Sequence, residues 1–183
     1  MRLDHIAYRV KNRYKTARLF IDCFGYRISE DVPDGFKIEF DDGSAADCLV
    51  LVPPEQLSGN APWIAEHYFG HEYIHYHLAP EIFISDGTND SIVGKWVDER
   101  GGIGGIHHIA FQVDSVENKM LEWKAKGYVE FATTEPLSCP GLVQIFTKPS
   151  ELTGVIYELI ERENQGFCKD NVKALMESTK KFQ

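Results

Sequence analysis

The sequence predicts an α+β fold made of two βαβββ modules that form an open barrel, followed by a C-terminal helix. Two observations support this fold class. A His-Ile-Ala-aromatic-x-Val segment occurs twice, beginning at His5 and at His108. Each copy is followed by a stretch with helical spacing that ends at a glycine, Gly25 in the first copy and Gly127 in the second. An internal repeat of this kind indicates two similar units.

The first module is predicted over residues 1–88. Its opening segment alternates like a β-strand, with an apolar face that opposes His5. Next come a helix, three short strands, an insertion rich in histidine and aromatic residues, and a last strand. The expected ranges are 12–24 for the helix, 26–32, 36–40 and 48–52 for the short strands, 55–80 for the insertion and 81–85 for the last strand.

Residues 89–105 are predicted to link the modules through a helix over 90–100, with Asp90 as its N-cap, and a glycine-rich connector. The second module is expected over 106–162. Its helix has Asp114 and Glu117 in capping-box positions. The remaining predictions are strands over 129–133, 142–147 and 155–160, and a C-terminal segment 163–183 with a helix over 170–182.

The composition is that of a globular protein. The chain has 183 residues, of which 43% are hydrophobic, and its net charge of -9 argues against nucleic acid or an anionic membrane as a partner. No apolar run is long enough to span a bilayer, and no signal peptide is expected. The four cysteines are far apart and form no C-x-x-C pair, so we expect reduced thiols in a cytoplasmic protein.

Three residues form a candidate metal site. His5 and His108 occupy the same position of the repeat, and Glu158 is a carboxylate within an otherwise apolar strand. Such a carboxylate needs a cation, a hydrogen-bond network or a metal. Two imidazoles and one carboxylate form the facial triad of non-haem iron(II) oxygenases. The alternative is two hydrogen-bonded core histidines and a glutamate paired with an arginine, but the duplicated context favours a metal.

Three other features suggest no separate site. His71, Glu72 and His75 match the H-E-x-x-H motif of zinc proteases, but the flanking residues alternate as in a strand, which favours a chance match. The glycines of residues 101–105 precede a strand, so a dinucleotide-binding loop is not expected. Because side chains alternate along a strand, His107 is expected on the face opposite His108, either in a structural role or in support of a metal ligand.

The two His-Ile-Ala segments, the repeated βαβββ pattern and residues 154–158 resemble the vicinal oxygen chelate superfamily. That superfamily contains glyoxalase I, methylmalonyl-CoA epimerase, extradiol dioxygenases, 4-hydroxyphenylpyruvate dioxygenase and metal-free drug-binding proteins. The resemblance covers nearly the whole chain except residues 55–80. Residues 91–96 and 105–110 are similar to the epimerase, whereas residues 144–149 and 165–175 resemble the C-terminal domain of 4-hydroxyphenylpyruvate dioxygenase.

The resemblance to the dioxygenase implies a role for each matching residue. It implies that His5, His108 and Glu158 hold Fe(II), that Gln144 contacts the substrate, and that Phe167 belongs to the helix covering the active site. The implied substrates are a 2-oxo acid, or a related carbonyl compound, and O2. The chain departs from the dioxygenase at several positions that concern the aromatic part of its substrate: His107 and Val172 replace a glutamine and a phenylalanine, and residues 92–94 replace another glutamine.

A fourth position separates the two enzyme classes. Glyoxalase and the epimerase carry a glutamate or glutamine on the last strand of the first module, where the count in this chain falls near Phe83, with Glu81 two residues away on the same face. Phe83 at the site leaves three ligands and favours an oxygenase. Glu81 at the site favours an isomerase or lyase with a non-redox metal such as Zn, Co, Ni or Mn. A metal-free ligand-binding protein is the third possibility, and analogy with other single barrels indicates a homodimer.

Overall fold

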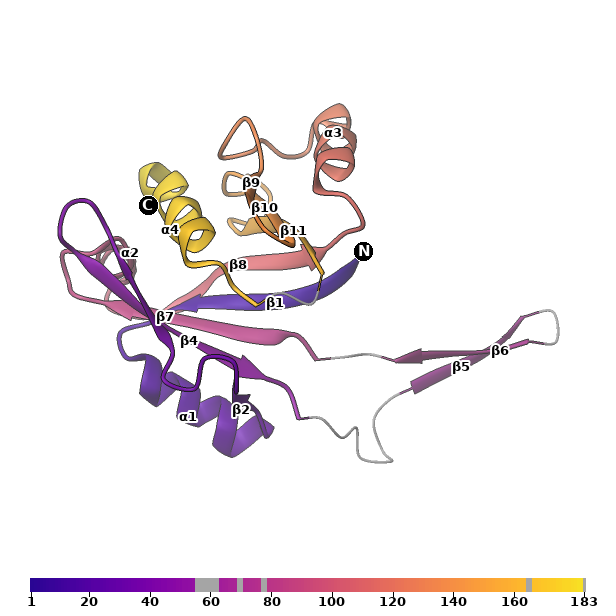
Figure 1. Ribbon diagram of the computed structural model, residues 1–183, viewed down its shortest axis with the longest axis horizontal. Helices are drawn as coiled ribbons and strands as arrows, with labels where there is room; N and C mark the ends of the chain where they lie inside the picture. Colours follow the sequence, from indigo (N-terminus) through magenta and orange to yellow (C-terminus); the bar gives the residue numbers. More distant parts are fainter. Residues whose placement is uncertain (55–62, 69–70, 77–78, 164–165, 183) are drawn as a thin grey trace.

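The computed structural model describes residues 1–54, 63–68, 71–76, 79–163 and 166–182. These residues form a mixed α+β fold with one large open sheet and four α-helices (Figure 1). The strand order is β2-β4-β7-β1-β8-β11-β10-β9, and β3 pairs with β4 off this path. The predicted α+β class, with a sheet that curves but does not close, is confirmed.

The large sheet consists of two halves that meet at β1 and β8. The first half-sheet contains β1 (Arg2–Arg9), β2 (Arg27–Ile28), β3 (Phe36–Glu39), β4 (Ala45–Val52) and β7 (Glu81–Gly87). The second half-sheet contains β8 (Gly105–Gln112), β9 (Leu137–Cys139), β10 (Leu142–Phe146) and β11 (Ile156–Arg162). The central strands β1 and β8 are antiparallel, and each pairs in parallel with the last strand of its own half, β7 or β11. The two halves therefore repeat one arrangement of strands.

The predicted helices form with small shifts at their ends, and the last one stops at Ser178, four residues earlier than predicted. They are α1 (Arg13–Phe24), α2 (Ile92–Glu99), α3 (Val116–Lys126) and α4 (Lys169–Ser178), the last followed by a 3-10 turn (Lys180–Phe182). Gly25 and Gly127 end α1 and α3 in left-handed conformations, with φ of 73° and 72°. The predicted caps Asp90 and Asp114 are wrong by one residue, because the hydroxyls of Ser91 and Ser115 accept the first-turn N–H groups instead.

Two predicted strands differ in the structure. The strand expected over 26–32 shortens to β2, and residues 129–133 contribute only an isolated bridge between Phe131 and Thr147. The edge of β10 pairs instead with β9, a strand that the sequence did not predict. Phe131 packs among the buried side chains under α3. Tertiary pairing thus decides which segment becomes a strand, overriding local propensity.

Within the insertion, β5 (Trp63–Tyr68) and β6 (His71–Tyr76) pair antiparallel in a separate two-stranded sheet (Figure 1). The H-E-x-x-H motif lies on β6, so His71 and His75 are about 13 Å apart along an extended backbone. The prediction of a strand here is confirmed, and a zinc-protease helix is excluded. None of the described helices is long and apolar enough to cross a membrane.

Helices cover both faces of the large sheet. α1 packs on the first half-sheet and α3 on the second, where their apolar residues join the buried side chains of β4, β7, β10 and β11. On the other face, Val172 and Met176 of α4 pack into the core of the first half-sheet, and α4 also contacts β9 and β10 of the second. α4 therefore bridges the two halves over the central strands.

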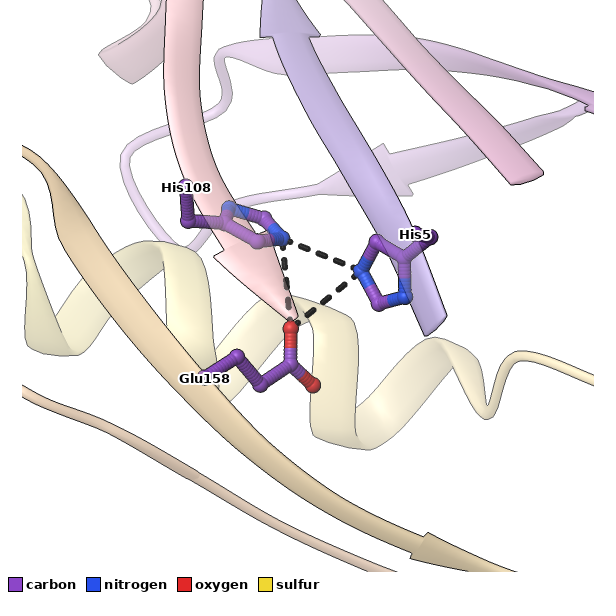
Figure 2. Close-up of side chains that lie close together, drawn as sticks. All are labelled: His5, His108 and Glu158. Carbon is purple, nitrogen blue, oxygen red and sulfur yellow. Dashed lines mark hydrogen bonds and ion pairs between the residues drawn. The ribbon is translucent and has the colours of Figure 1, made fainter. Parts of the chain in front are cut away.

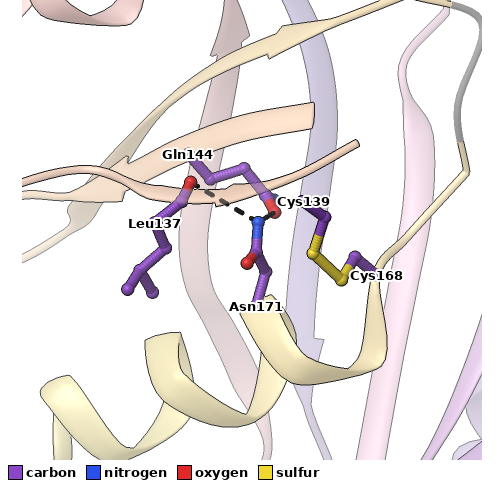
Figure 3. The surroundings of a disulfide bond; sticks show 5 residues. All are labelled: Leu137, Cys139, Gln144, Cys168 and Asn171. Carbon is purple, nitrogen blue, oxygen red and sulfur yellow. Dashed lines mark hydrogen bonds between the residues drawn. A yellow bond between two sulfur atoms is a disulfide. The ribbon is translucent and has the colours of Figure 1, made fainter. Parts of the chain in front are cut away.

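A disulfide fixes the beginning of α4. Cys139 at the end of β9 is bonded to Cys168, the residue before α4 (Figure 3). Cys23 and Cys48 are free. The prediction of four reduced thiols is wrong for the bonded pair, because the fold brings together two cysteines that lie far apart in the sequence. The cysteines consequently no longer support the expected cytoplasmic location.

Candidate metal centre

The three predicted ligands meet in the middle of the large sheet (Figure 2). Glu158 Oε2 lies 3.3 Å from His5 Nε2 and 3.2 Å from His108 Nε2, and the two Nε2 atoms are 3.2 Å apart. All three side chains are buried. Among the described residues, this His-His-Glu triad is the group whose ligand atoms are close enough together to hold a metal ion.

The register of the central strands explains why these side chains meet. In the antiparallel pair, His5 lies opposite Ala110 and Ala7 lies opposite His108. In the parallel pair of β8 and β11, Ala110 lies beside Glu158. Paired residues share a face of the sheet, so all three ligands point to the same side, and the two alanines leave room for them.

A β-bulge precedes each histidine of the triad. The register of β1 and β8 shifts on either side of Asp4 and again at His107, so neither residue has a direct partner. At such a bulge, consecutive side chains can lie on the same face. His5 Nδ1 is 2.8 Å from Asp4 Oδ1, and His108 Nδ1 is 2.9 Å from His107 Nδ1. The prediction that His107 points away from His108 is therefore wrong, since strict alternation fails at the bulge.

Other protein groups hold the outer atoms of the triad. Gln144 Nε2 donates to Glu158 Oε1 at 2.6 Å. Asn171 Nδ2 of α4 donates in turn to Gln144 Oε1 at 3.1 Å (Figure 3). Asp4 also pairs with Arg162 at 2.8 Å. Because these contacts occupy the outer atoms, the two Nε2 atoms and one carboxylate oxygen are left pointing toward one another. Hydrogen bonds to the outer atoms of metal ligands orient those ligands toward the metal.

The electrostatics of the triad give its members different protonation states. Burial lowers the pKa of His5, but the Glu158 and Asp4 carboxylates outweigh it and raise that pKa to about 9. Burial lowers the pKa of His108 to about 4, against the attraction of Glu158. Burial raises the pKa of Glu158, but the two histidines outweigh it and hold that pKa well below its ordinary value. At neutral pH the triad thus holds an anionic Glu158 and a neutral His108, the forms that bind metals, and a protonated His5 that would release its proton when a metal binds.

The triad fits a divalent metal ion in both chemistry and spacing. Nitrogen and oxygen ligands lie about 2.0–2.2 Å from such an ion, which places neighbouring ligand atoms roughly 3 Å apart around an octahedron. The observed separations of 3.2–3.3 Å are close to that value. Without a metal, the protonated His5 balances the charge of Glu158, and a divalent ion would take the place of that proton between the same atoms. The donor set is the two-histidine, one-carboxylate triad.

Phe83 occupies the position that the repeat relates to Glu158. Ala7 pairs with Phe83 in the parallel β1–β7 register, just as Ala110 pairs with Glu158 between β8 and β11. The rings of Phe83 and His5 have centroids 6.5 Å apart. Glu81 lies on the same strand, but its carboxylate is 3.0 Å from Arg162 Nη2. The structure therefore directs Glu81 to an arginine and leaves an apolar ring at the fourth position.

A family model decides the relationship of the chain to known proteins. The model of the Glyoxalase/Bleomycin resistance protein/Dioxygenase superfamily matches residues 2–154. The chain belongs to this superfamily. A comparison with curated proteins finds no significant match.

Solved structures of this superfamily's fold include both epimerases and a synthase. A methylmalonyl-CoA epimerase is 19% identical with a TM-score of 0.61, over 90% of this chain and 97% of that one. The epimerase from Mycobacterium tuberculosis is 18% identical with a TM-score of 0.58, over 88% and 87%. A mutant 4-hydroxymandelate synthase from Streptomyces coelicolor is 20% identical with a TM-score of 0.70, over 97% of this chain and 52% of that one. The chain thus spans about half the length of the synthase, and these likenesses concern the fold.

In this superfamily member, α4 and the residue before its cap close the cavity beside the triad. Phe167 places its ring centroid 5.1 Å from that of His5 and 5.0 Å from that of Phe83. The cavity has a volume of only about 30 Å³, room for roughly two water molecules. Gln144 and Phe167, the two residues predicted to serve the substrate, both line it.

Sequence reasoning missed three polar residues of this centre. Asp4 immediately precedes a predicted ligand, and Arg9 alternates onto the same strand face as His5, so both left a signal in the sequence. Arg9 lines the cavity and is buried. Asn171, on α4, left no signal in the sequence, because its contact with Gln144 depends on how the last helix packs across the sheet.

Proposed function

We propose that the chain is a non-haem Fe(II) dioxygenase of the 4-hydroxyphenylpyruvate dioxygenase type, acting on a 2-oxo acid with O2. The observation that supports this proposal most strongly is the three-ligand set of the triad, with Phe83 where a four-ligand site would have its extra carboxylate. Open coordination positions distinguish oxygenase sites from closed, structural ones. Fe(II) held by the triad would supply the redox chemistry for oxidative decarboxylation of the 2-oxo acid by O2.

The residues around the triad would prepare it for this reaction. Asp4 and His107 hold the Nδ1 atoms and so fix the two imidazole rings. Gln144 fixes Glu158 and, because it lines the cavity, is placed to orient the substrate as well. The rings of Phe83 and Phe167 keep water from the reacting groups.

α4 would act as a lid over the substrate. The cavity of about 30 Å³ is too small for a 2-oxo acid while α4 is in place. α4 spans both half-sheets, and the disulfide ties its beginning to β9. An outward movement of the rest of the helix about this tether would open the cavity, and its return would exclude water from the bound substrate.

The proposal is tested with protein loaded with Fe(II) under anaerobic conditions. We expect a visible charge-transfer band when a 2-oxo acid is added, followed by O2 uptake and CO2 release when air is admitted. His5→Ala should abolish all three signals. Glu81→Gln is the matched control and should keep them, because Glu81 contacts Arg162 and lies outside the triad.

Two results would contradict the proposal in different ways. If iron loading gives neither band nor O2 uptake, while Zn, Co, Ni or Mn supports exchange of a proton beside a carbonyl group, the chain is an epimerase-like or glyoxalase-like enzyme. If no divalent metal binds, it is a metal-free ligand-binding protein.

A further inference from the structure

A buried arginine lines the same cavity as the triad but takes no part in it. Arg9 lies on β1, four residues after His5 and on the same face, and its side chain is 2% exposed. Neither of its terminal nitrogens, Nη1 and Nη2, has a hydrogen-bond partner among the described residues. The cavity wall includes both Arg9 and the triad. Buried charged groups are normally paired, so this guanidinium calls for a partner that the described residues do not supply.

The surroundings of Arg9 do not compensate its charge. Its guanidinium carbon lies 5.9 Å from the ring centroid of Trp96, a contact that gives Nη1 and Nη2 no hydrogen-bond acceptor. The exposed Arg100 stacks on the same ring at 3.7 Å and adds a second positive charge. Burial lowers the pKa of Arg9 to about 9, with Arg100 acting in the same direction, so the group is still protonated at neutral pH.

We propose that Arg9 binds a second carboxylate of the substrate, at the end remote from the triad. This inference rests on the proposed function, and it narrows the substrate class to 2-oxo acids that carry a carboxylate at their far end. Two free terminal nitrogens in a planar fork match the two oxygens of a carboxylate. The backbone positions of His5 and Arg9 are about 13 Å apart along the strand, and the guanidinium and the triad line the same cavity.

The same geometry disfavours an aromatic substrate. An aromatic or aliphatic group at this end of the cavity would leave the guanidinium buried and unpaired, which a binding site penalises strongly. The departures from the aromatic-acid dioxygenase at His107 and Val172 agree with this preference, since both side chains line the cavity.

The experiment measures binding to protein loaded with Zn(II), which performs no oxygen chemistry. Isothermal titration compares 2-oxoglutarate with 2-oxopentanoate, and 2-oxoadipate with 2-oxohexanoate. Within each pair, only the far carboxylate is replaced by a methyl group. We expect the diacid of the better-fitting length to bind at least about tenfold more tightly than its monoacid, as a desolvated charge-assisted pair should.

Three variants assign this preference to its residue. Arg9→Met should reduce the affinity for the diacid to that for the monoacid, leave the monoacid unchanged, and unfold at the same or a higher temperature, because it removes a buried unpaired charge. Arg9→Lys should keep part of the preference. Arg100→Met, which removes the exposed guanidinium on the same ring, should keep all of it.

Several outcomes would overturn the proposal for Arg9. The first is equal affinity for both members of each pair, and the second is binding of neither member. The third is an equal loss of affinity for diacid and monoacid in Arg9→Met. The fourth is a lower unfolding temperature of that variant, which would mark a structural role. The result also separates the two proposals. A diacid preference on the Zn(II) protein without O2 uptake on the Fe(II) protein contradicts only the dioxygenase, whereas equal kcat/KM for diacids and monoacids contradicts only the role of Arg9.

Discussion

The two half-sheets build the triad with the same geometry but from different chemical groups. Each supplies a histidine after a β-bulge, and the bulge residue contacts its Nδ1 atom: Asp4 in the first half and His107 in the second. Each also presents one residue at the equivalent position of its last strand, Phe83 in the first half and Glu158 in the second. The repeat therefore fixes where the side chains lie, and their identities decide what the site can do.

The difference between the halves means that the two sides of the centre carry different chemical groups. The first half contributes a basic imidazole backed by a carboxylate, together with an apolar wall. The second contributes a neutral imidazole and the anionic ligand. A fully symmetric site would carry two carboxylates and four ligands. Replacing one of them with phenylalanine leaves coordination positions open on one side of a metal ion.

The largest effect is expected when the two equivalent positions are changed separately. Glu158→Ala should weaken Fe(II) binding by more than about 100-fold and abolish O2 uptake, because it removes a ligand and not merely a supporting group. Phe83→Leu, at the position equivalent by the repeat, should keep the metal affinity. Metal titration checks both, and equal losses in the two variants would contradict the assigned asymmetry.

A second difference between the halves is the disulfide, which occurs only in the second half of the described chain. Cys139→Ser should lower the free energy of unfolding by about 3–4 kcal/mol, as expected for a bond that closes a loop of this length; the two cysteines are 29 residues apart. Denaturant unfolding with and without reductant measures the effect. Cys23→Ser is the control, since that thiol is free and exposed. Stability that does not respond to reductant would contradict the bond.

The bulge residues should differ in how much they support the metal. Asp4→Asn removes an anionic partner of His5 and should weaken metal binding by about 10–100-fold. His107→Gln replaces one neutral partner of His108 with another, so its effect should be smaller than that of Asp4→Asn. Metal affinities are measured at one pH, and thermal unfolding is measured on the metal-free variants. Together they distinguish a weakened metal site from a destabilised fold. A larger loss in His107→Gln would reverse the proposed roles of the halves.

The smallest effect is expected at Glu81. Glu81→Gln should leave both the number of bound metal ions and their affinity within about twofold of the wild type, because side chains outside the metal's surroundings have minor effects. Elemental analysis and titration with Co(II) measure the two quantities. A large fall in affinity would make Glu81 a fourth ligand and favour an isomerase.

The sequence was sufficient to predict much of this centre. The duplicated segment located His5 and His108, and the isolated carboxylate in an apolar strand located Glu158, because period-two alternation and burial leave clear patterns. The sequence did not reveal on which face of the sheet His107 lies. A β-bulge shifts the alternation of side chains, and the bulge depends on how two distant strands pair. For the same reason, no sequence spacing indicated the bond between Cys139 and Cys168.

The fourth position shows where the sequence count fails. The insertion separates β4 from β7, so counting along the chain could not choose between Phe83 and Glu81. The parallel register of β1 with β7 makes that choice, because it places Phe83 beside Ala7 and Glu81 beside His5. A register between strands about 75 residues apart is a property of the assembled sheet and of the whole core.

A crystal structure of the protein with Fe(II) bound under anaerobic conditions tests the central claim most directly. We predict one ion held by His5 Nε2, His108 Nε2 and Glu158 Oε2, with Phe83 beside it and Glu81 still paired with Arg162. An ion bound elsewhere, or one that draws Glu81 away from Arg162 as a fourth ligand, would contradict the three-ligand site.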